Sequence, residues 1–256
     1  MFDLLRVRAR QGNRTTGFPR EIPLLPARFR GRPRIDGTAC AQGCRACVDA
    51  CPTEAISVVD DRPRIDLGKC IFCTACVEAC PTGAITFTPE FAMATRTRES
   101  LVVGEKGLEL AEALEAKSRS LFGRSLALRQ VSAGGCNGCE VEVNALQNVV
   151  FDISRFGISL VASPRHADGL LITGPVTRNM LLALEKTYQA VADPKIVVAV
   201  GGCAISGGPF RDLPEVNNGA DSLVPVDLYV PGCPPHPLTI LDGLLRLLGR
   251  IENGER

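Results

Sequence analysis

The chain has 256 residues, of which 45% are hydrophobic and 22% are charged, and its formal net charge is +1 at pH 7. This composition excludes an intrinsically disordered chain, and the length predicts two domains or one large one. The longest apolar stretches, 195–202 and 238–249, are too short or too interrupted by charge to span a bilayer, which takes about 20 apolar residues. We therefore expect a globular protein without a transmembrane helix.

The first 35 residues form a basic arm, with nine arginines against Asp3 and Glu21. Prolines at positions 19, 23, 26 and 33 prevent a continuous helix beyond about residue 18, which predicts an extended arm lying on a surface. A solvated, disordered tail is the alternative. The arm has no apolar core of the kind that a signal peptide requires, and a mitochondrial presequence would be rich in Ser and nearly free of Pro. We expect no export by the general secretory route.

Twelve cysteines without a secretory signal, most of them clustered, indicate metal binding rather than a disulfide framework. Eight of them lie between positions 40 and 80. There the sequence repeats itself with an offset of 29 residues, because CRACVDACPTEAISV from Cys44 matches CTACVEACPTGAITF from Cys73. The region therefore contains two copies of one unit.

The two units have the spacings C-x3-C-x2-C-x3-C-P and C-x2-C-x2-C-x3-C-P. Three closely spaced thiolates can bind three irons of one 4Fe-4S cluster, while the fourth, followed by proline, reaches the neighbouring cluster. Zinc is the alternative, but structural zinc sites usually pair two C-x2-C motifs across a longer gap and have no need of the prolines. The predicted ligands are Cys40, Cys44, Cys47 and Cys80 for one cluster, and Cys51, Cys70, Cys73 and Cys76 for the other.

This half of the chain resembles bacterial dicluster ferredoxins throughout its length. The stretches FRGRPRIDGTAC and IDLGKCIFCTACVEACPTGAITFTPEF resemble the ferredoxin-type subunit of formate hydrogenlyase and, more distantly, its counterpart in respiratory complex I. The basic arm lies within this resemblance, which implies that the arm packs on a partner subunit.

Residues 91–124 contain no cysteine, and the amphipathic stretch from Glu109 to Phe122 predicts a helical linker. From Ser125 onward, short apolar runs alternate with helical patterns, which predicts a parallel, three-layer α/β sheet. The expected strands are 125–131, 158–163, 169–174, 195–201 and 226–230, and the expected helices are 141–153, 178–192 and 236–251.

The remaining cysteines each follow an expected strand and lie among glycines, in SAGGCNGCE, VGGCAISGG and VPGCPPHP. In a parallel sheet these loops emerge at one edge, where open α/β folds bind ligands. The glycines allow backbone N–H groups to approach cluster sulfurs. Structural cysteines, the alternative, would lie inside strands. Cys136, Cys139, Cys203 and Cys233 are therefore predicted to hold a third 4Fe-4S cluster.

Residues 125–251 resemble the small subunit of membrane-bound nickel-iron hydrogenases of the formate hydrogenlyase type, which is related to the complex I subunit that holds the last cluster before quinone. The matching segments are GGCNGCEVEVNAL, FDISRFGISLVASPRHADGLLITGPVTRNM, GGCAISGGPF and VPVDLYVPGCPPHP. Complex I has two adjacent cysteines where this chain has Cys136-x2-Cys139, and this difference favours the hydrogenase side. The resemblance implies a fusion of two subunits. The expected parts are a basic arm (1–35), a dicluster ferredoxin domain (36–90), a helical linker (91–124) and a flavodoxin-like α/β domain (125–256).

The resemblance implies an electron-transfer subunit with three 4Fe-4S clusters and no catalytic centre of its own. Its expected partners are a nickel-iron hydrogenase-like large subunit, other soluble and membrane subunits of the complex, and an electron donor protein or subunit. The complex is expected to lie on the cytoplasmic side of the inner membrane. One alternative is the equivalent subunit of a complex I-like quinone reductase, or of a related complex lacking nickel. A remote alternative is a zinc-stapled nucleic-acid adaptor.

Two histidines and four charged residues are weaker candidates. His236 is expected at a helix start near the partner interface, and His166 at the surface or in packing. The charged residues could line the interface with the catalytic subunit or form salt bridges within the domain. They are Asp152, Arg155, Arg165 and Asp168.

Overall fold

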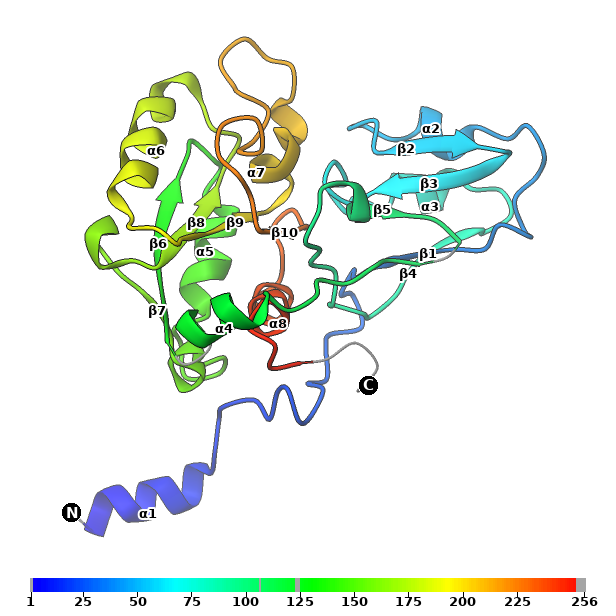
Figure 1. Cartoon of the computed structure of the whole chain (residues 1–256). Helices are drawn as coiled ribbons and strands as arrows, with labels where there is room; N and C mark the ends of the chain where they lie inside the picture. The colour runs from blue at the N-terminus through cyan, green and yellow to red at the C-terminus, as the bar shows by residue number, and fades with distance from the viewer. Residues whose placement is uncertain (1, 106, 123–124, 252–256) are drawn as a thin grey trace.

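The computed structural model describes residues 2–105, 107–122 and 125–251. Small antiparallel sheets occupy the N-terminal half, and a parallel sheet flanked by helices occupies the C-terminal half (Figure 1). The α/β class and the ferredoxin-like N-terminal region agree with the prediction. No helix in these three ranges is long and apolar enough to cross a membrane.

The N-terminal half is built from short elements. A three-stranded sheet has the order β2-β3-β5, and β1 pairs with β4 in a second, two-stranded sheet. Helix α3 ends at Ala79, and the next residue, Cys80, has the extended backbone that is typical of a residue before proline. The bounds are β1 Pro33–Ile35, α2 Ala46–Asp49, β2 Ile56–Val59, β3 Arg62–Asp66, α3 Ala75–Ala79, β4 Ile85–Phe87 and β5 Val102–Val103.

The C-terminal half contains five parallel strands in the order β10-β9-β8-β6-β7. Read from β7, this is the flavodoxin-like order 2-1-3-4-5. Every residue of β8 and β9 is buried, as expected of parallel strands covered on both faces. The strands are β6 Leu126–Ser132, β7 Ile158–Leu160, β8 Gly169–Thr173, β9 Ile196–Val200 and β10 Leu228–Val230.

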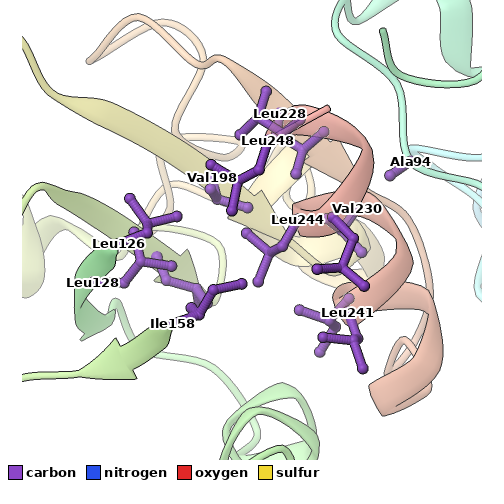
Figure 2. Close-up of a cluster of buried hydrophobic side chains, with 14 of the residues drawn as sticks. Ala94, Leu126, Leu128, Ile158, Val198, Leu228, Val230, Leu241, Leu244 and Leu248 are labelled. Atoms are coloured by element: carbon purple, nitrogen blue, oxygen red, sulfur yellow. The ribbon is translucent and has the colours of Figure 1, made fainter. Parts of the chain in front are cut away.

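Helices cover both faces of this sheet. Figure 2 shows Leu126, Leu128 and Val198 of the strands packed with Leu241 and Leu244 of α8. Strand residues of the opposite face pack with α6 in a separate cluster. The helices are α5 Gly138–Ala145, α6 Arg178–Ala190, α7 Gly202–Ser206 and α8 Pro237–Leu247, with 3-10 turns η2 Ile153–Phe156, η3 Pro164–His166 and η4 Gly208–Phe210.

The segment between the two sheets is less helical than the sequence predicts. The helix expected from Glu109 is observed only as α4, Ala116–Phe122, and the 3-10 turn η1, Glu99–Leu101, precedes β5. Backbone groups of this segment bond to other segments instead of to one another within a helix. The N–H of Ala111 donates to the carbonyl of Ala94, and the N–H of Leu114 donates to the carbonyl of Leu247. Residues 109–115 therefore use their backbone to join neighbouring segments.

The basic arm has two parts. Helix α1, Phe2–Gln11, buries no residue and projects from the body of the molecule (Figure 1). From Thr16 onward the arm packs on its own chain: Arg155 donates to the carbonyls of Thr16 and Phe18, and the Phe18 ring lies 5.5 Å from that of Phe91. This part of the arm therefore contacts its own chain, and the contact with a partner subunit that the resemblance implies stays a prediction.

The two halves share a hydrophobic core. Leu67 and Leu101 of the N-terminal half belong to the same buried cluster as Ala199, Ile205 and Tyr229 of the C-terminal half. A hydrogen bond reinforces this contact, because the buried hydroxyl of Ser206 donates to the Gly68 carbonyl at 2.7 Å. The ferredoxin-like region is therefore fixed against the β9–β10 side of the sheet.

Candidate metal centres

The first set of thiols surrounds α2 and the end of α3. Burial, followed by the negative charges of Cys44 and Cys80, raises the pKa of Cys40. Burial first, and then the charges of Cys40 and Cys80, also raise the pKa of Cys47. Because such charge effects act over short distances, the structure brings these four thiols together across the two repeated units.

The second set lies between α3 and the three-stranded sheet. Burial, followed by the charges of Cys76, Cys51 and Cys73, raises the pKa of Cys70 to about 12. Burial and the charges of Cys51 and Cys73 raise the pKa of Cys76 to about 11. All four thiols line one cavity, whose remaining lining is largely apolar and includes Ile56, Ile65, Ile71 and Phe87.

The third set lies at the carboxyl edge of the parallel sheet. Cys136 and Cys139 follow β6, Cys203 lies in α7 directly after β9, and Cys233 follows β10. Burial and then the charges of Cys203, Glu140, Cys233 and Cys136 raise the pKa of Cys139. Burial, with the charges of Cys233 and Cys136 next, raises the pKa of Cys203 to about 12. Loops separated by up to 97 positions of sequence thus bring four thiols to one place.

Backbone N–H groups point at the cysteine sulfurs in both repeated units. The N–H of Ala55 donates to Cys51 Sγ at 3.2 Å, and the N–H of Ala84 donates to Cys80 Sγ at 3.3 Å. Both donors lie four residues after their cysteine, so the repeat extends to these bonds. Hydrogen bonds of this kind stabilise thiolate ligands and tune the potential of a cluster.

Glycines let the backbone approach the third set of sulfurs. Gly201, with φ +90°, could not carry a side chain, because a Cβ there would lie 2.4 Å from Cys139 Sγ. At Gly208, with φ +55°, a Cβ would lie 2.9 Å from Cys203 Sγ. The close contact of glycine backbone with sulfur is therefore built into these loops.

The donor chemistry of all three sets fits 4Fe-4S clusters, each of which takes four thiolates. All twelve cysteines are free thiols. In the three described ranges, no group of three or more His, Cys, Asp or Glu residues is arranged to hold a single metal ion. A 4Fe-4S cluster differs from a single ion because its four thiolates bind different irons.

Comparison with known proteins divides the chain as the thiol sets do. Residues 32–81 match the family described as the 4Fe-4S dicluster domain, and residues 136–247 match the NADH ubiquinone oxidoreductase 20 Kd subunit. "Probable membrane-bound hydrogenase subunit mbhJ" of Pyrococcus furiosus is 46% identical over 130 residues, which are 51% of this chain and 78% of that protein. The chain belongs to the family of the 20 kDa subunit of NADH-ubiquinone oxidoreductase. It is also an iron-sulfur protein, because it joins that family to a dicluster domain.

Other members of the 20 kDa subunit family are similar to the same half of the chain. Formate hydrogenlyase subunit 7 of Escherichia coli is 50% identical over 129 residues, and the match spans about half of each protein, 50% of this chain and 51% of the relative. A subunit of the NADH-quinone oxidoreductase of Bacteroides fragilis is 44% identical over 133 residues, or 51% of this chain and 67% of the relative. These relatives are named as subunits of oxidoreductases. A chain of the membrane-bound sulfane sulfur reductase, an archaeal respiratory membrane complex, aligns at 38% identity with a TM-score of 0.47, covering 56% of this chain and 78% of that one.

The three sets of thiols follow one another in space. The charge of Cys47, from the first set, contributes to the raised pKa of Cys76 in the second, after burial and two nearer thiolates. A Cβ on Gly202, beside Cys203 of the third set, would lie 3.7 Å from the Cys70 carbonyl of the second. The second set therefore lies between the other two.

Four of the six weaker candidates form hydrogen bonds within the chain, and the other two are exposed. His236 caps α8, since its Nδ1 accepts from the N–H of Leu238 at 3.2 Å, and His166 is exposed. Two of the charged residues bind backbone: Arg155 holds the arm, and Asp168 accepts from the N–H of Ala127 at 2.7 Å. Asp152 accepts from the Ser154 hydroxyl at 2.5 Å, and Arg165 is exposed. Within the described ranges, the salt bridges found include none of these four charged residues.

One buried acidic residue was missed by sequence reasoning. Glu140, only 6% exposed, directly follows Cys139 and accepts hydrogen bonds from Ser132 and Thr173. The sequence did contain a signal for this residue, because an acidic residue follows the second cysteine of the Gly-rich loop CNGCE. If that loop is buried, a charge there is costly unless it has hydrogen-bond partners.

Proposed function

We propose that the chain is an electron-transfer subunit that carries three 4Fe-4S clusters. The observation that carries this proposal is the grouping of all twelve cysteines into three sets of four, each built from residues distant in sequence. The ligand assignment is Cys40, Cys44, Cys47 and Cys80 for the first cluster; Cys51, Cys70, Cys73 and Cys76 for the second; and Cys136, Cys139, Cys203 and Cys233 for the third.

The proposed domain organisation follows from this assignment. Residues 36–90 form the dicluster domain and 125–256 the α/β domain, with the arm at 1–35 and the connecting segment at 91–124. Clusters bound at the three sets supply one-electron redox chemistry. A contact within the chain supports this order for the second and third sets, because Gly68, in the turn before Cys70, is hydrogen-bonded to Ser206 in the helix that carries Cys203. With clusters bound at the three sets, electrons would pass between the first and the third through the second.

The proposed partner at the far end is the large subunit of a membrane-bound nickel-iron hydrogenase of the formate hydrogenlyase type. Two cysteines of the third set, Cys136 and Cys233, are exposed, and Val141 of α5, two residues after Cys139, is 57% exposed. A large subunit covering this edge would shield the cluster and receive its electrons. A donor protein or subunit delivers electrons at the first cluster. Attachment to the cytoplasmic side of the membrane comes through other subunits.

The second candidate is the equivalent subunit of a complex I-like quinone reductase, or of a related complex without nickel. It is favoured by the 44% identity to a subunit of NADH-quinone oxidoreductase. The C-x2-C spacing of Cys136 and Cys139 supports the hydrogenase instead. Nickel in the complex that co-purifies with this chain separates the two candidates.

Iron and sulfide analysis tests the cluster proposal. The anaerobically purified chain is expected to be brown and to contain about 12 iron and about 12 acid-labile sulfide, from three clusters of four each. Zinc in place of iron would contradict electron transfer and would support the remote zinc-stapled adaptor.

A further inference from the structure

Glu140 is a buried carboxylate to which the proposed electron route gives no role. It lies in the first turn of α5, directly after Cys139, and is 6% exposed. Its Oε1 accepts from Ser132 Oγ at 2.6 Å and from Thr173 Oγ1 at 2.7 Å. Because leaving a carboxylate buried is costly, the position of this residue needs a reason beyond local packing.

Two strands of the sheet hold the side chain of Glu140. Ser132 and Thr173 end strands β6 and β8 and are directly paired across the sheet, so both hydroxyls reach the same oxygen. The side chain lies in the first turn of α5, directly after Cys139, so both strands and the helix hold it in place. Among the described residues, the ion pairs found do not include Glu140. The hydrogen bonds described for its side chain therefore come from two uncharged hydroxyl groups.

The charge of Glu140 reaches the third set of thiols. After burial and the nearest thiolates, it contributes to the raised pKa of both Cys139 and Cys203. The loops that close over it are tight, since a Cβ on Gly135 would lie 3.5 Å from Glu140 Oε1 and 3.1 Å from Gly174 Cα. The carboxylate is thus fixed against the loop that carries Cys136 and Cys139, the second of which directly precedes it in the sequence.

We propose that Glu140 is a positioning residue that acts as a fixed negative charge and lowers the reduction potential of the third cluster. This inference rests on the proposed function. Adding one electron to a cluster next to a fixed anion is less favourable than adding it elsewhere, because like charges repel more strongly away from water. The reduced third cluster is then a stronger electron donor to the partner. In the sequence, none of the eight cysteines of the first and second sets is directly followed by an acidic residue.

The test is a redox titration of the full chain with its clusters, followed by paramagnetic resonance. Glu140→Gln removes the charge but keeps an oxygen that accepts from Ser132 and Thr173. At a fixed potential near the wild-type midpoint, the ratio of reduced to oxidised third cluster is expected to rise at least tenfold, which is 59 mV for a one-electron couple. The first and second clusters serve as the internal reference and are expected not to shift.

Two further variants separate charge from packing. Glu140→Asp keeps the charge while shortening the side chain, and it is expected to retain most of the low potential. Glu185→Gln removes the same charge from an exposed position on α6 and is expected to leave all three midpoints unchanged. Equal shifts in the Gln and Asp variants, or no shift in Glu140→Gln, would overturn the inference.

The titration also distinguishes this inference from the proposed function. The third cluster is the signal that disappears in Cys203→Ser, and iron content is measured for every variant. A wild-type chain that has iron for only two clusters contradicts the proposed function, and the inference falls with it. A wild-type chain with three clusters and an unshifted Glu140→Gln variant contradicts the inference alone.

Discussion

The two halves of this chain hold their thiols by opposite means. In the N-terminal half, the strands have two to five residues and the helices α2 and α3 have four and five. Cysteines themselves belong to its buried core, with Cys47 and Cys76 among the core residues. In the C-terminal half, by contrast, the thiols lie at the edge of a sheet, and cysteine is absent from the buried clusters described on its two faces. The proposed ligands of the N-terminal half are thus part of its core, whereas those of the C-terminal half lie at the edge of a sheet that has a core of its own.

This difference predicts that the folded state of the N-terminal half depends on bound metal more than that of the C-terminal half does. Domains as small as the N-terminal half bury little apolar surface and commonly depend on metal for stability. The sheet domain contributes part of the core of this half, namely Ala199, Ile205 and Tyr229. The sheet domain has two clusters of buried apolar side chains of its own, one on each face.

Removal of iron is expected to give the largest difference in stability between the two halves. Chelation under oxidising conditions is expected to abolish the protease resistance of residues 36–90 before that of residues 125–251. The reason is that eight cysteines left without iron in the small half are either repelling thiolates or protonated groups without a sufficient core. Limited proteolysis followed by mass spectrometry measures the order. Survival of a metal-free N-terminal half beyond the sheet domain would contradict the comparison.

A smaller effect is expected from loosening the contact between the halves. Ser206→Ala leaves the buried Gly68 carbonyl without its 2.7 Å hydrogen bond, which is expected to lower the free energy of unfolding by about 1–3 kcal/mol. Ser159→Ala, at an exposed position of β7, is the matched control and should change it by less than about 0.5 kcal/mol. Urea midpoints of the cluster-loaded variants give the comparison. Equal midpoints would show that this bond does not join the halves.

The sequence predicts the sheet domain well because its signals are local. Runs such as GLLIT and IVVAV are largely apolar, and their short length and β-branched residues favour a parallel strand covered on both faces. The connecting segment was predicted less well: Leu110 and Leu114 have helical spacing, but the backbone of residues 109–115 bonds to distant segments. The spacing of apolar residues indicates which face of a segment is buried. It does not indicate whether the backbone bonds within a helix or to a distant segment.

The same limit applies to the candidate site. Cysteine spacing indicates which thiols belong to one unit, and the position of loops after strands predicts that distant thiols meet. The carboxylate of Glu140 could not be placed, because its partners Ser132 and Thr173 lie on two strands whose pairing only the folded sheet reveals. The contact of the arm with its own chain could not be predicted for a similar reason, since the backbone carbonyls that bind Arg155 leave no trace in composition.

The most direct test of the account is the reduced Cys203→Ser variant, because it asks whether the two halves hold clusters independently. Replacing one thiol of the third set is expected to lower iron from about 12 to about 8 per chain. Paramagnetic resonance of the dithionite-reduced variant should retain the coupled signal of the two N-terminal clusters and lose that of the third. Loss of every signal, or an unchanged iron content, would contradict the division of the twelve cysteines on which the account depends.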